Sequence, residues 1–266
     1  MTAIESHVTE FMSSPVYTVP VSESLATAQR RIEELNISSI SVVDEKEELG
    51  GVITRTDLLR LGRERARDVR RPTLIALPDR PVGEVMTKPA IEIAPEATIQ
   101  QAAARILEHK IHRLYVVNQA KKLVGVLSTK DVMRAVFKAR VNVPLAKLMS
   151  TPVYTVEASE RAWVATDMLE KKQVSGVTVI EDGGPVGFFT KSEALAARDL
   201  SALTPVGDVM NCSIVCLPAS THLFRAAAII VETYARRVLA TEEGRVAGIL
   251  TGTDFVRAAA MGGQAA

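Results

Sequence analysis

A short pattern that begins with methionine occurs four times along the chain, and it limits the fold to a repeated small unit. Repetition of this kind predicts several copies of one supersecondary structure, each too small to be stable alone. The four segments are FMSSPVYTV, VMTKPAIEI, LMSTPVYTV and VMNCSIVCL, which contain Met12, Met86, Met149 and Met210. These segments open what we number copies 1 to 4.

Counting forward from each methionine gives the same layout in every copy. A helical pattern opens 13 residues later, an apolar run ends after 30 and 31 residues, and a glycine opens GVIT, GVLS, GFFT or GILT after 38 or 39. An acidic residue comes last: Asp57, Asp131, Glu193 and Asp254. Each copy therefore predicts the order strand, helix, strand, strand, helix, in which the last two strands form a hairpin.

A capping residue is expected before the first helix of each copy. In copy 1 this residue is Ser22, because the apolar face that follows carries Leu25 and Ile32. The matching residues elsewhere are Glu96, Ser159 and Ser220. The second helix carries its acid in the first turn, where the helix dipole favours negative charge.

The repeated pattern resembles the cystathionine-β-synthase (CBS) motif, through its Met-x-x-Pro start and its closing G-h-h-[ST]-x-x-[DE], where h is hydrophobic. Copy 2, with EHKIHRLYVV, is also similar to the γ-subunit of AMP-activated protein kinase, which has four CBS motifs and binds adenine nucleotides. The chain departs from the pattern where copy 4 lacks the proline. Members of the family often have a proline directly before the two residues that end the apolar run. This chain has Ser41, Tyr115, Thr178 and Leu239 there instead.

The resemblance implies an α/β fold in which four CBS repeats, each a small sheet with two helices, pair into two Bateman modules that form a flat disc. The first pair is expected over residues 1–140, with motifs at about 8–67 and 81–140. The second is expected over residues 141–266, with motifs at about 144–200 and 205–260. The disc is expected either as a monomer or as a homodimer of stacked discs.

Each copy places a hydroxyl residue three positions before its acid, where a strand meets a helix. Both side chains then lie on one face of the first helical turn, where the acid can accept hydrogen bonds from ribose and backbone amides suit a phosphate. A plain helix cap would use the same residues. Repetition and the resemblance favour nucleotide binding, at Thr54 and Asp57, Ser128 and Asp131, Thr251 and Asp254, and Thr190 with the longer Glu193.

Copies 2 and 4 carry basic residues where the central strand begins, whereas copies 1 and 3 carry small residues there. A cation beside an apolar strand needs a partner, which is either a phosphate or an acid of a neighbouring copy. Strand alternation turns one member of each basic pair inward. The resemblance favours phosphate. The basic residues are His112, Arg113, Arg236 and Arg237, and the small ones are Ser38, Ser39, Ser175 and Gly176.

Each binding cleft is expected to join the hydroxyl–acid pair of one copy to the strand backbone of its partner. The best sites combine an aspartate with small partner residues, and the Glu193 site is expected to be the weakest. The two best sites are Ser128 and Asp131 facing Ile37 and Ser38, and Thr251 and Asp254 facing Val174 and Ser175.

Composition and motifs exclude several other classes of function. Thirty-two Lys and Arg balance 31 Asp and Glu, so no general basic field predicts nucleic-acid binding. No nucleophile or metal-ligand set with a recognisable spacing occurs, so we expect neither an enzyme nor a metal site. Two cysteines, Cys212 and Cys216, are too few for a disulfide scaffold and suit the cytoplasm. No apolar stretch of about 20 residues predicts a membrane span.

The sequence therefore favours a regulatory energy-sensing module that binds AMP, ADP or ATP and signals to a partner protein. One alternative is a scaffolding protein whose clefts bind little or nothing. Another is a sensor of S-adenosylmethionine or NAD, although the basic pairs favour a ligand with phosphate. An arginine-rich stretch between copies 1 and 2, in residues 62–80, is either a docking surface or a solvated linker.

Overall fold

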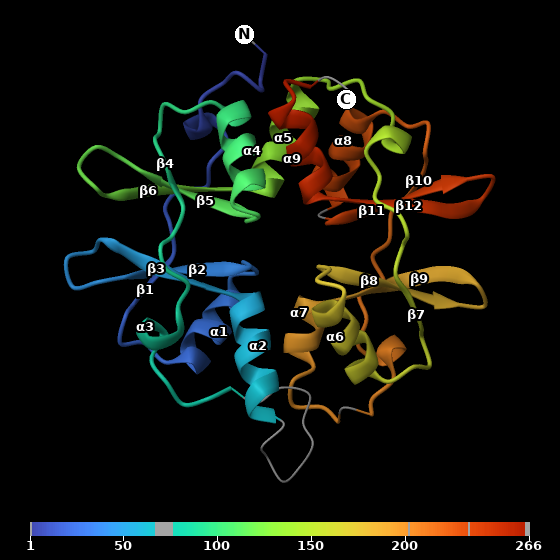
Figure 1. Cartoon of the computed structure of the whole chain (residues 1–266), viewed down its shortest axis with the longest axis horizontal. Coiled ribbons are helices and arrows are strands. Elements are labelled where there is room, and N and C mark those ends of the chain that lie inside the picture. Colours follow the sequence, from blue (N-terminus) through green and yellow to red (C-terminus); the bar gives the residue numbers. More distant parts are fainter. Residues whose placement is uncertain (1, 67–76, 202, 234, 264–266) are drawn as a thin grey trace. The chain divides into compact units, whose positions relative to one another are not determined.

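The structure, a computed structural model, describes residues 2–66, 77–201, 203–233 and 235–263 (Figure 1). The mixed α/β fold of four repeats is confirmed, because each copy forms a three-stranded sheet with the predicted helices. Within each sheet the first strand pairs in parallel with the second, and the second pairs with the third as an antiparallel hairpin. Most of the arginine-rich stretch, residues 67–76, lies outside the described residues.

The elements repeat in the same order along the chain. Copy 1 contains β1 (Thr18–Pro20), α1 (Leu25–Glu34), β2 (Ser39–Val43), β3 (Leu49–Thr54) and α2 (Arg55–Ala66). Copy 2 contains α3 (Val82–Val85), β4 (Glu92–Ile93), α4 (Ile99–Glu108), β5 (Arg113–Val117), β6 (Leu123–Ser128) and α5 (Thr129–Lys138). Copy 3 contains β7 (Thr155–Glu157), α6 (Ala162–Lys171), β8 (Gly176–Glu181), β9 (Gly184–Thr190) and α7 (Lys191–Ala196). Copy 4 contains β10 (Cys216–Pro218), α8 (Leu223–Thr233), β11 (Arg237–Glu242), β12 (Arg245–Thr251) and α9 (Gly252–Ala260).

The first helix of copy 1 begins where the methionine spacing predicts, but its predicted cap, Ser22, is wrong. The N-cap is Ser24, whose hydroxyl accepts a hydrogen bond from the Thr27 amide at 3.1 Å. Ser24 is held extended by a β-bridge to Pro81, and such a long-range contact leaves no local signal in the sequence. The predicted caps Glu96 and Ser159 are wrong by the same two residues, because the caps are Thr98 and Arg161. Ser220 is also wrong, because α8 begins at Leu223 and a cap directly precedes its helix.

The methionine that opens each copy packs on the sheet of another copy. Met86 lies against Gly51, where an added Cβ would come within 2.8 Å of both the Met86 sulfur and the Thr87 carbonyl oxygen. Glycine is therefore needed where this segment crosses the strand. The four contacts are Met12 on Gly125, Met86 on Gly51, Met149 on Gly248 and Met210 on Gly187. Copies 1 and 2 thus exchange their opening segments, as do copies 3 and 4. Their assignment to modules 1–140 and 141–266 stays a prediction.

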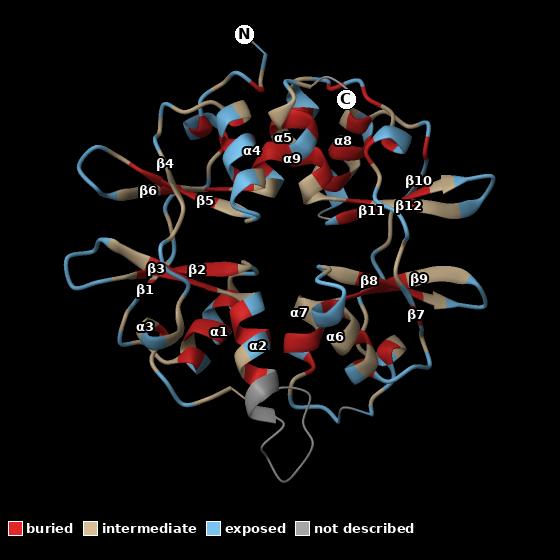
Figure 2. Cartoon of the chain, viewed as in Figure 1, coloured by how far each residue is buried: buried red, intermediate tan, exposed pale blue. Residues whose placement is uncertain are grey.

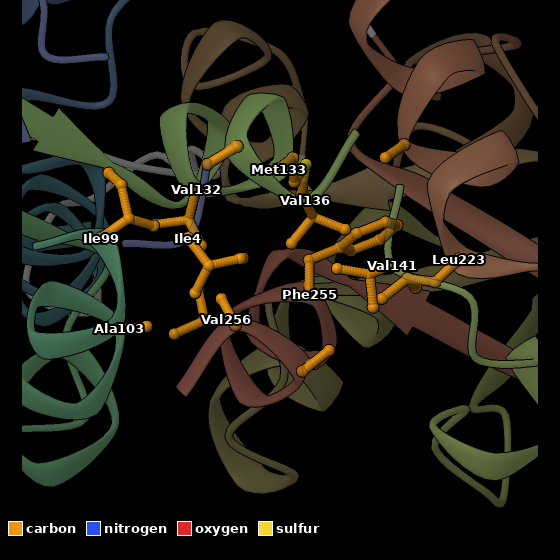
Figure 3. Close-up of a cluster of buried hydrophobic side chains, with 14 of the residues drawn as sticks. Ile4, Ile99, Ala103, Val132, Met133, Val136, Val141, Leu223, Phe255 and Val256 are labelled. Atoms are coloured by element: carbon orange, nitrogen blue, oxygen red, sulfur yellow. The ribbon is translucent and has the colours of Figure 1, made fainter. Parts of the chain in front are cut away.

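Unit 1 comprises residues 1–16, 91–153 and 214–266, so it contains the sheets and main helices of copies 2 and 4. Helix α4 packs against α9, and α5 packs against both α8 and α9. Figure 3 shows part of the apolar core between them, where Val136, Val141 and Leu223 surround Phe255. This core holds the starts of α5 and α9, and hence the acids of copies 2 and 4, in fixed positions.

Unit 2 comprises residues 17–90 and 154–213, so it contains the sheets and main helices of copies 1 and 3. Helix α2 packs against α7, over a core that includes Ile40, Leu58 and Phe189. Figure 2 shows the buried side of these helices and the exposed residues on their other sides. Among the described residues, no helix combines the length and apolar character needed to cross a membrane.

Candidate functional site

Both hydroxyl–acid pairs of unit 1 close the first turn of a helix. The amide and hydroxyl of Ser128 donate to Asp131 Oδ2 at 2.8 and 2.7 Å, at the start of α5. The amide and hydroxyl of Thr251 donate to Asp254 Oδ2 at 2.7 and 3.1 Å, at the start of α9. Each aspartate is buried, with 5% of Asp131 and 1% of Asp254 exposed. The structure therefore brings together the residues that the spacing predicts.

The pairs of unit 2 form the same contacts. Thr54 donates through its amide and hydroxyl to Asp57 Oδ2 at 2.9 and 2.6 Å. The Thr190 amide donates to Glu193 Oε2 at 3.0 Å, and its hydroxyl donates to the same oxygen. Glu193 is less buried than Asp57. All four pairs form the two reciprocal bonds of a capping box, which the plain-cap interpretation also requires, so a role in binding ribose stays a prediction.

The second oxygen of each aspartate contacts an arginine one turn further along the helix. Asp131 Oδ1 lies 3.3 Å from Arg134 Nη1, and Asp254 Oδ1 lies 3.3 Å from Arg257 Nη1. In copy 1 the matching residue is Arg60, 3.5 Å from Asp57 Oδ1. Sequence reasoning missed these arginines, although D-x-x-R in three copies was a visible signal.

Hydroxyls from the exchanged segments also reach the second oxygen in two copies. Thr87, next to Met86, donates to Asp57 Oδ1 at 3.3 Å, and Ser150, next to Met149, donates to Asp254 Oδ1 at 3.5 Å. Burial raises the pKa of Asp254 above its ordinary value, although the hydrogen bonds from Thr251, the charge of Arg257 and the Ser150 hydroxyl each oppose this rise. The sequence could not show these contacts, because they depend on the exchange of segments.

The inward basic residues of unit 1 stand directly across the hairpin from the helix caps. Arg113 on β5 pairs with Ser128 on β6, and Arg237 on β11 pairs with Thr251 on β12. The predicted alternation is confirmed, since Arg237 is buried and Arg113 half-buried, whereas the preceding His112 and Arg236 are exposed.

The charge of Arg113 is influenced by groups from two copies. Burial lowers the pKa of its guanidinium, and the charge of Arg236 lowers it further. Tyr115 and Asp131 act in the opposite direction. The charges of Arg113 in copy 2 and Arg236 in copy 4 therefore influence each other within unit 1.

Unit 2 has small residues at the matching strand positions and cations elsewhere. Ser39 pairs with Thr54, and Gly176 pairs with Thr190. Arg55 and Lys191, the first residues of α2 and α7, bond across the helix pair: Arg55 Nη1 to Ser192 Oγ at 2.5 Å and Lys191 Nζ to Thr56 Oγ1 at 3.1 Å. Sequence reasoning missed these two cations.

The residues predicted to face the two best sites all lie in unit 2, just before β2 and β8. Ile37 and Ser38 are half-buried, as is Val174, and Ser175 is exposed. The Ser38 carbonyl oxygen accepts a hydrogen bond from the Arg55 amide at 3.1 Å. Their predicted partners, Asp131 and Asp254, belong to unit 1, so these pairings stay predictions.

Other features of the described residues add no catalytic group to the site. An open groove of about 770 Å³ in unit 2 is lined by residues near the α1 cap, including Ser24, Arg80 and Lys88, and by none of the predicted binding residues. Cys212 and Cys216 are exposed free thiols. Within the described ranges, no group of three or more His, Cys, Asp or Glu could hold a metal ion.

Comparison with known proteins finds the same fold over nearly the whole chain. Protein MJ1225 of Methanocaldococcus jannaschii, proposed to be an archaeal homologue of γ-AMPK, superposes with a TM-score of 0.82 and 18% identity, over 94% of this chain and 99% of that one. Its sequence is 24% identical over 190 residues, which are 64% of this chain and 68% of that protein. An uncharacterised protein of Pyrococcus horikoshii superposes with a TM-score of 0.67 and 17% identity, over 95% and 99% of the two chains.

A similarity to one enzyme is restricted to a small part of that enzyme. The A-adding tRNA nucleotidyltransferase of Aquifex aeolicus is 28% identical over 124 residues, which are 46% of this chain but 15% of the enzyme. The model of the CBS domain matches this chain four times, at residues 8–64, 82–138, 145–199 and 206–261. The chain is therefore a member of the CBS-domain family, with four CBS domains.

Proposed function

We propose that the protein is a regulatory module that binds an adenine nucleotide (AMP, ADP or ATP) and signals its presence to a partner protein. Binding would use the hydroxyl–acid pairs for ribose and the basic residues for phosphate. The first sites to be filled are those of Asp131 and Asp254. The proposal also includes the pairing of copy 1 with copy 2 and of copy 3 with copy 4, and a location in the cytoplasm.

One observation supports the proposal most strongly: both helix caps of unit 1 have an arginine directly across the hairpin. The register pairs Arg113 with Ser128 and Arg237 with Thr251. A ribose held by the acid would therefore have a cation beside it for its phosphate. Charge-assisted bonds from arginine to phosphate are about twice as strong as neutral ones. In unit 2 the matching positions hold Ser39 and Gly176, which carry no charge.

The proposal is tested by calorimetric titration of the full chain with AMP, ADP, ATP, NAD, S-adenosylmethionine and adenosine. We expect the phosphate-bearing nucleotides to bind more tightly than adenosine, because only they engage the cations of unit 1. Tight binding of S-adenosylmethionine with weak binding of AMP would reject a nucleotide ligand in favour of another adenosyl ligand.

A scaffolding role is the second candidate, and the capping boxes favour it. Each acid already accepts hydrogen bonds from its own cap, so the four pairs stabilise helices whether or not a ligand binds. A scaffold would show no heat of binding and no shift in melting temperature with any of the six ligands. A ligand that binds the folded state must raise the melting temperature.

A further inference from the structure

We propose that the arginine one helical turn after the acid, Arg134 in copy 2 and Arg257 in copy 4, is a positioning residue that prepares the second carboxylate oxygen for ribose. Arg60 would do the same in copy 1. This inference rests on the proposed function, because it concerns how the same acids recognise their ligand. It adds residues that lie outside the hydroxyl–acid pairs and the basic strand positions.

The first carboxylate oxygen of each aspartate is already used. Oδ2 of Asp131 and of Asp254 each accepts two hydrogen bonds, one from an amide and one from a hydroxyl. These bonds fix the carboxylate in the first turn of its helix. Oδ1 is then the oxygen left for the ribose hydroxyls, and at Asp254 the Ser150 hydroxyl already contacts it at the long distance of 3.5 Å.

The arginine contacts this remaining oxygen at a longer distance. Arg134 and Arg257 approach Oδ1 to 3.3 Å, whereas a charge-assisted hydrogen bond of optimal geometry is about 2.7–2.9 Å long. Such a contact turns Oδ1 toward the guanidinium without filling its coordination. Arg134 Nη1 also lies 3.4 Å from the Phe11 carbonyl oxygen, so the opening segment of copy 1 limits where this side chain can lie.

The arginine also supplies positive charge to a buried acid. Asp254 is 1% exposed, and burial favours its neutral form. Arg257 on α9 opposes that effect, and the hydroxyls of Thr251 and Ser150 do so by hydrogen bonding. A further cation near this cap is Arg237, which pairs with Thr251 on the neighbouring strand. An ionised carboxylate is the better acceptor for ribose hydroxyls.

Copy 3 shows what happens without this arrangement. Its acid is Glu193, and the residue three positions later is Ala196, the last residue of α7. The arginine and the aspartate are thus absent together from the copy whose site is predicted to be the weakest. The D-x-x-R spacing in the other three copies is what a shared positioning role requires.

The test compares Arg257→Ala and Arg257→Lys with the natural chain, and Arg245→Ala serves as a control that removes an exposed cation from the preceding strand. Carbon-13 NMR of the Asp254 carboxyl group is measured without ligand. We expect Arg257→Ala to raise the pKa of Asp254 by about half a unit or more, because an opposite charge is lost, and Arg257→Lys to keep it near the natural value. An unchanged pKa in Arg257→Ala would overturn the proposal.

The second measurement is calorimetry with AMP and with 2′,3′-dideoxy-AMP, which has the phosphate but no ribose hydroxyls. Arg257→Ala should weaken AMP binding at the copy 4 site about three- to ten-fold and leave the dideoxy analogue unchanged, with recovery in Arg257→Lys. Equal losses for both ligands would assign Arg257 to the phosphate or to the fold instead. If the natural chain binds neither ligand, the proposed function fails, while the carboxyl pKa still decides whether Arg257 controls Asp254.

Discussion

Unit 1 and unit 2 have the same scaffold but place their cations differently. Both contain two copies of the repeat, and every copy closes a capping box at the start of its last helix. In unit 1 the cations stand at the start of the central strand, as Arg113 and Arg237. In unit 2 they stand one position into the helix, as Arg55 and Lys191, where each bonds to the opposite helix.

This difference distinguishes the capping boxes, which stabilise the fold, from the cations, which are proposed to bind the ligand. The capping box occurs in all four copies, so its presence alone does not distinguish a binding copy from a structural one. Cations at a helix start oppose the helix dipole, and those of unit 2 are engaged in joining α2 to α7. Cations at the strand start are not at a helix end, so the contrast supports the proposal that unit 1 recognises phosphate.

Substitution of the acids tests the difference between unit 1 and unit 2 most strongly. We expect the double variant Asp131→Asn and Asp254→Asn to weaken AMP binding about 100-fold, because each site loses a charged acceptor worth about 1.5–3 kcal/mol. Asparagine keeps an oxygen for the helix cap, so the fold should persist. The matched variant Asp57→Asn and Glu193→Gln should change AMP affinity much less. Calorimetry that found equal losses in the two variants would remove the distinction between the units.

The next largest effect is expected at Arg113. Replacing it with alanine should weaken AMP binding about ten- to 100-fold, while adenosine binding changes less, because only AMP has a phosphate. The control is Ser39→Ala, which alters the matching position in unit 2. Losses of the same size for AMP and adenosine would show that Arg113 supports the fold of the site and not its phosphate.

The exchanged methionines should be equally important in both units. Gly51→Ala forces a methyl group against Met86 and the Thr87 carbonyl, so we expect it to lower the free energy of unfolding by about 1–3 kcal/mol. Gly50→Ala is the neighbouring control, since its nearest contact would be an ordinary 3.5 Å. Urea denaturation gives both values. Similar stability of the two variants would mean that the methionine moves aside without cost.

The smallest effect should be a gain in stability at a residue of unit 2. Thr178 is 1% exposed, and its hydroxyl has no hydrogen-bond partner in the described part of the chain. Thr178→Val should therefore raise the free energy of unfolding by about 1 kcal/mol. Thr166→Val is the contrast, because that buried hydroxyl donates to the Ala162 carbonyl at 2.8 Å, and its loss should destabilise. A loss of stability in Thr178→Val would indicate a partner for this hydroxyl, such as a bound water.

Much of the fold could be predicted because the repeat fixes its own register. The 13-residue spacing from each methionine gave the correct first residue of α1, α4, α6 and α8. The hydroxyl–acid pairs were also predictable, since residues three apart in a first helical turn must meet. The arginines after the aspartates were equally visible in the sequence, but a pattern of exposed charges on a helix is usually only a solvated face.

The rest depends on contacts that cross the sequence. Ser22 has the composition of a cap, yet Ser24 caps α1 because Pro81, 57 residues away, holds it extended. The hydroxyls of Thr87 and Ser150 reach acids of other copies only because the opening segments are exchanged. No local pattern encodes such contacts. The predicted pairing of Asp131 with Ser38 also joins residues that are distant in the sequence, and it stays a prediction.

The exchange of opening segments determines the order in which the sheets can receive their methionines while the chain is synthesised. The chain leaves the ribosome at about 5–20 residues per second. The sheets of copies 2 and 4 receive Met12 and Met149, which are synthesised before them. The sheet of copy 1 must wait for Met86, and that of copy 3 for Met210. During translation, then, the sheets of the odd-numbered copies lack their methionine until the following copy has begun, whereas those of the even-numbered copies have theirs available as they emerge.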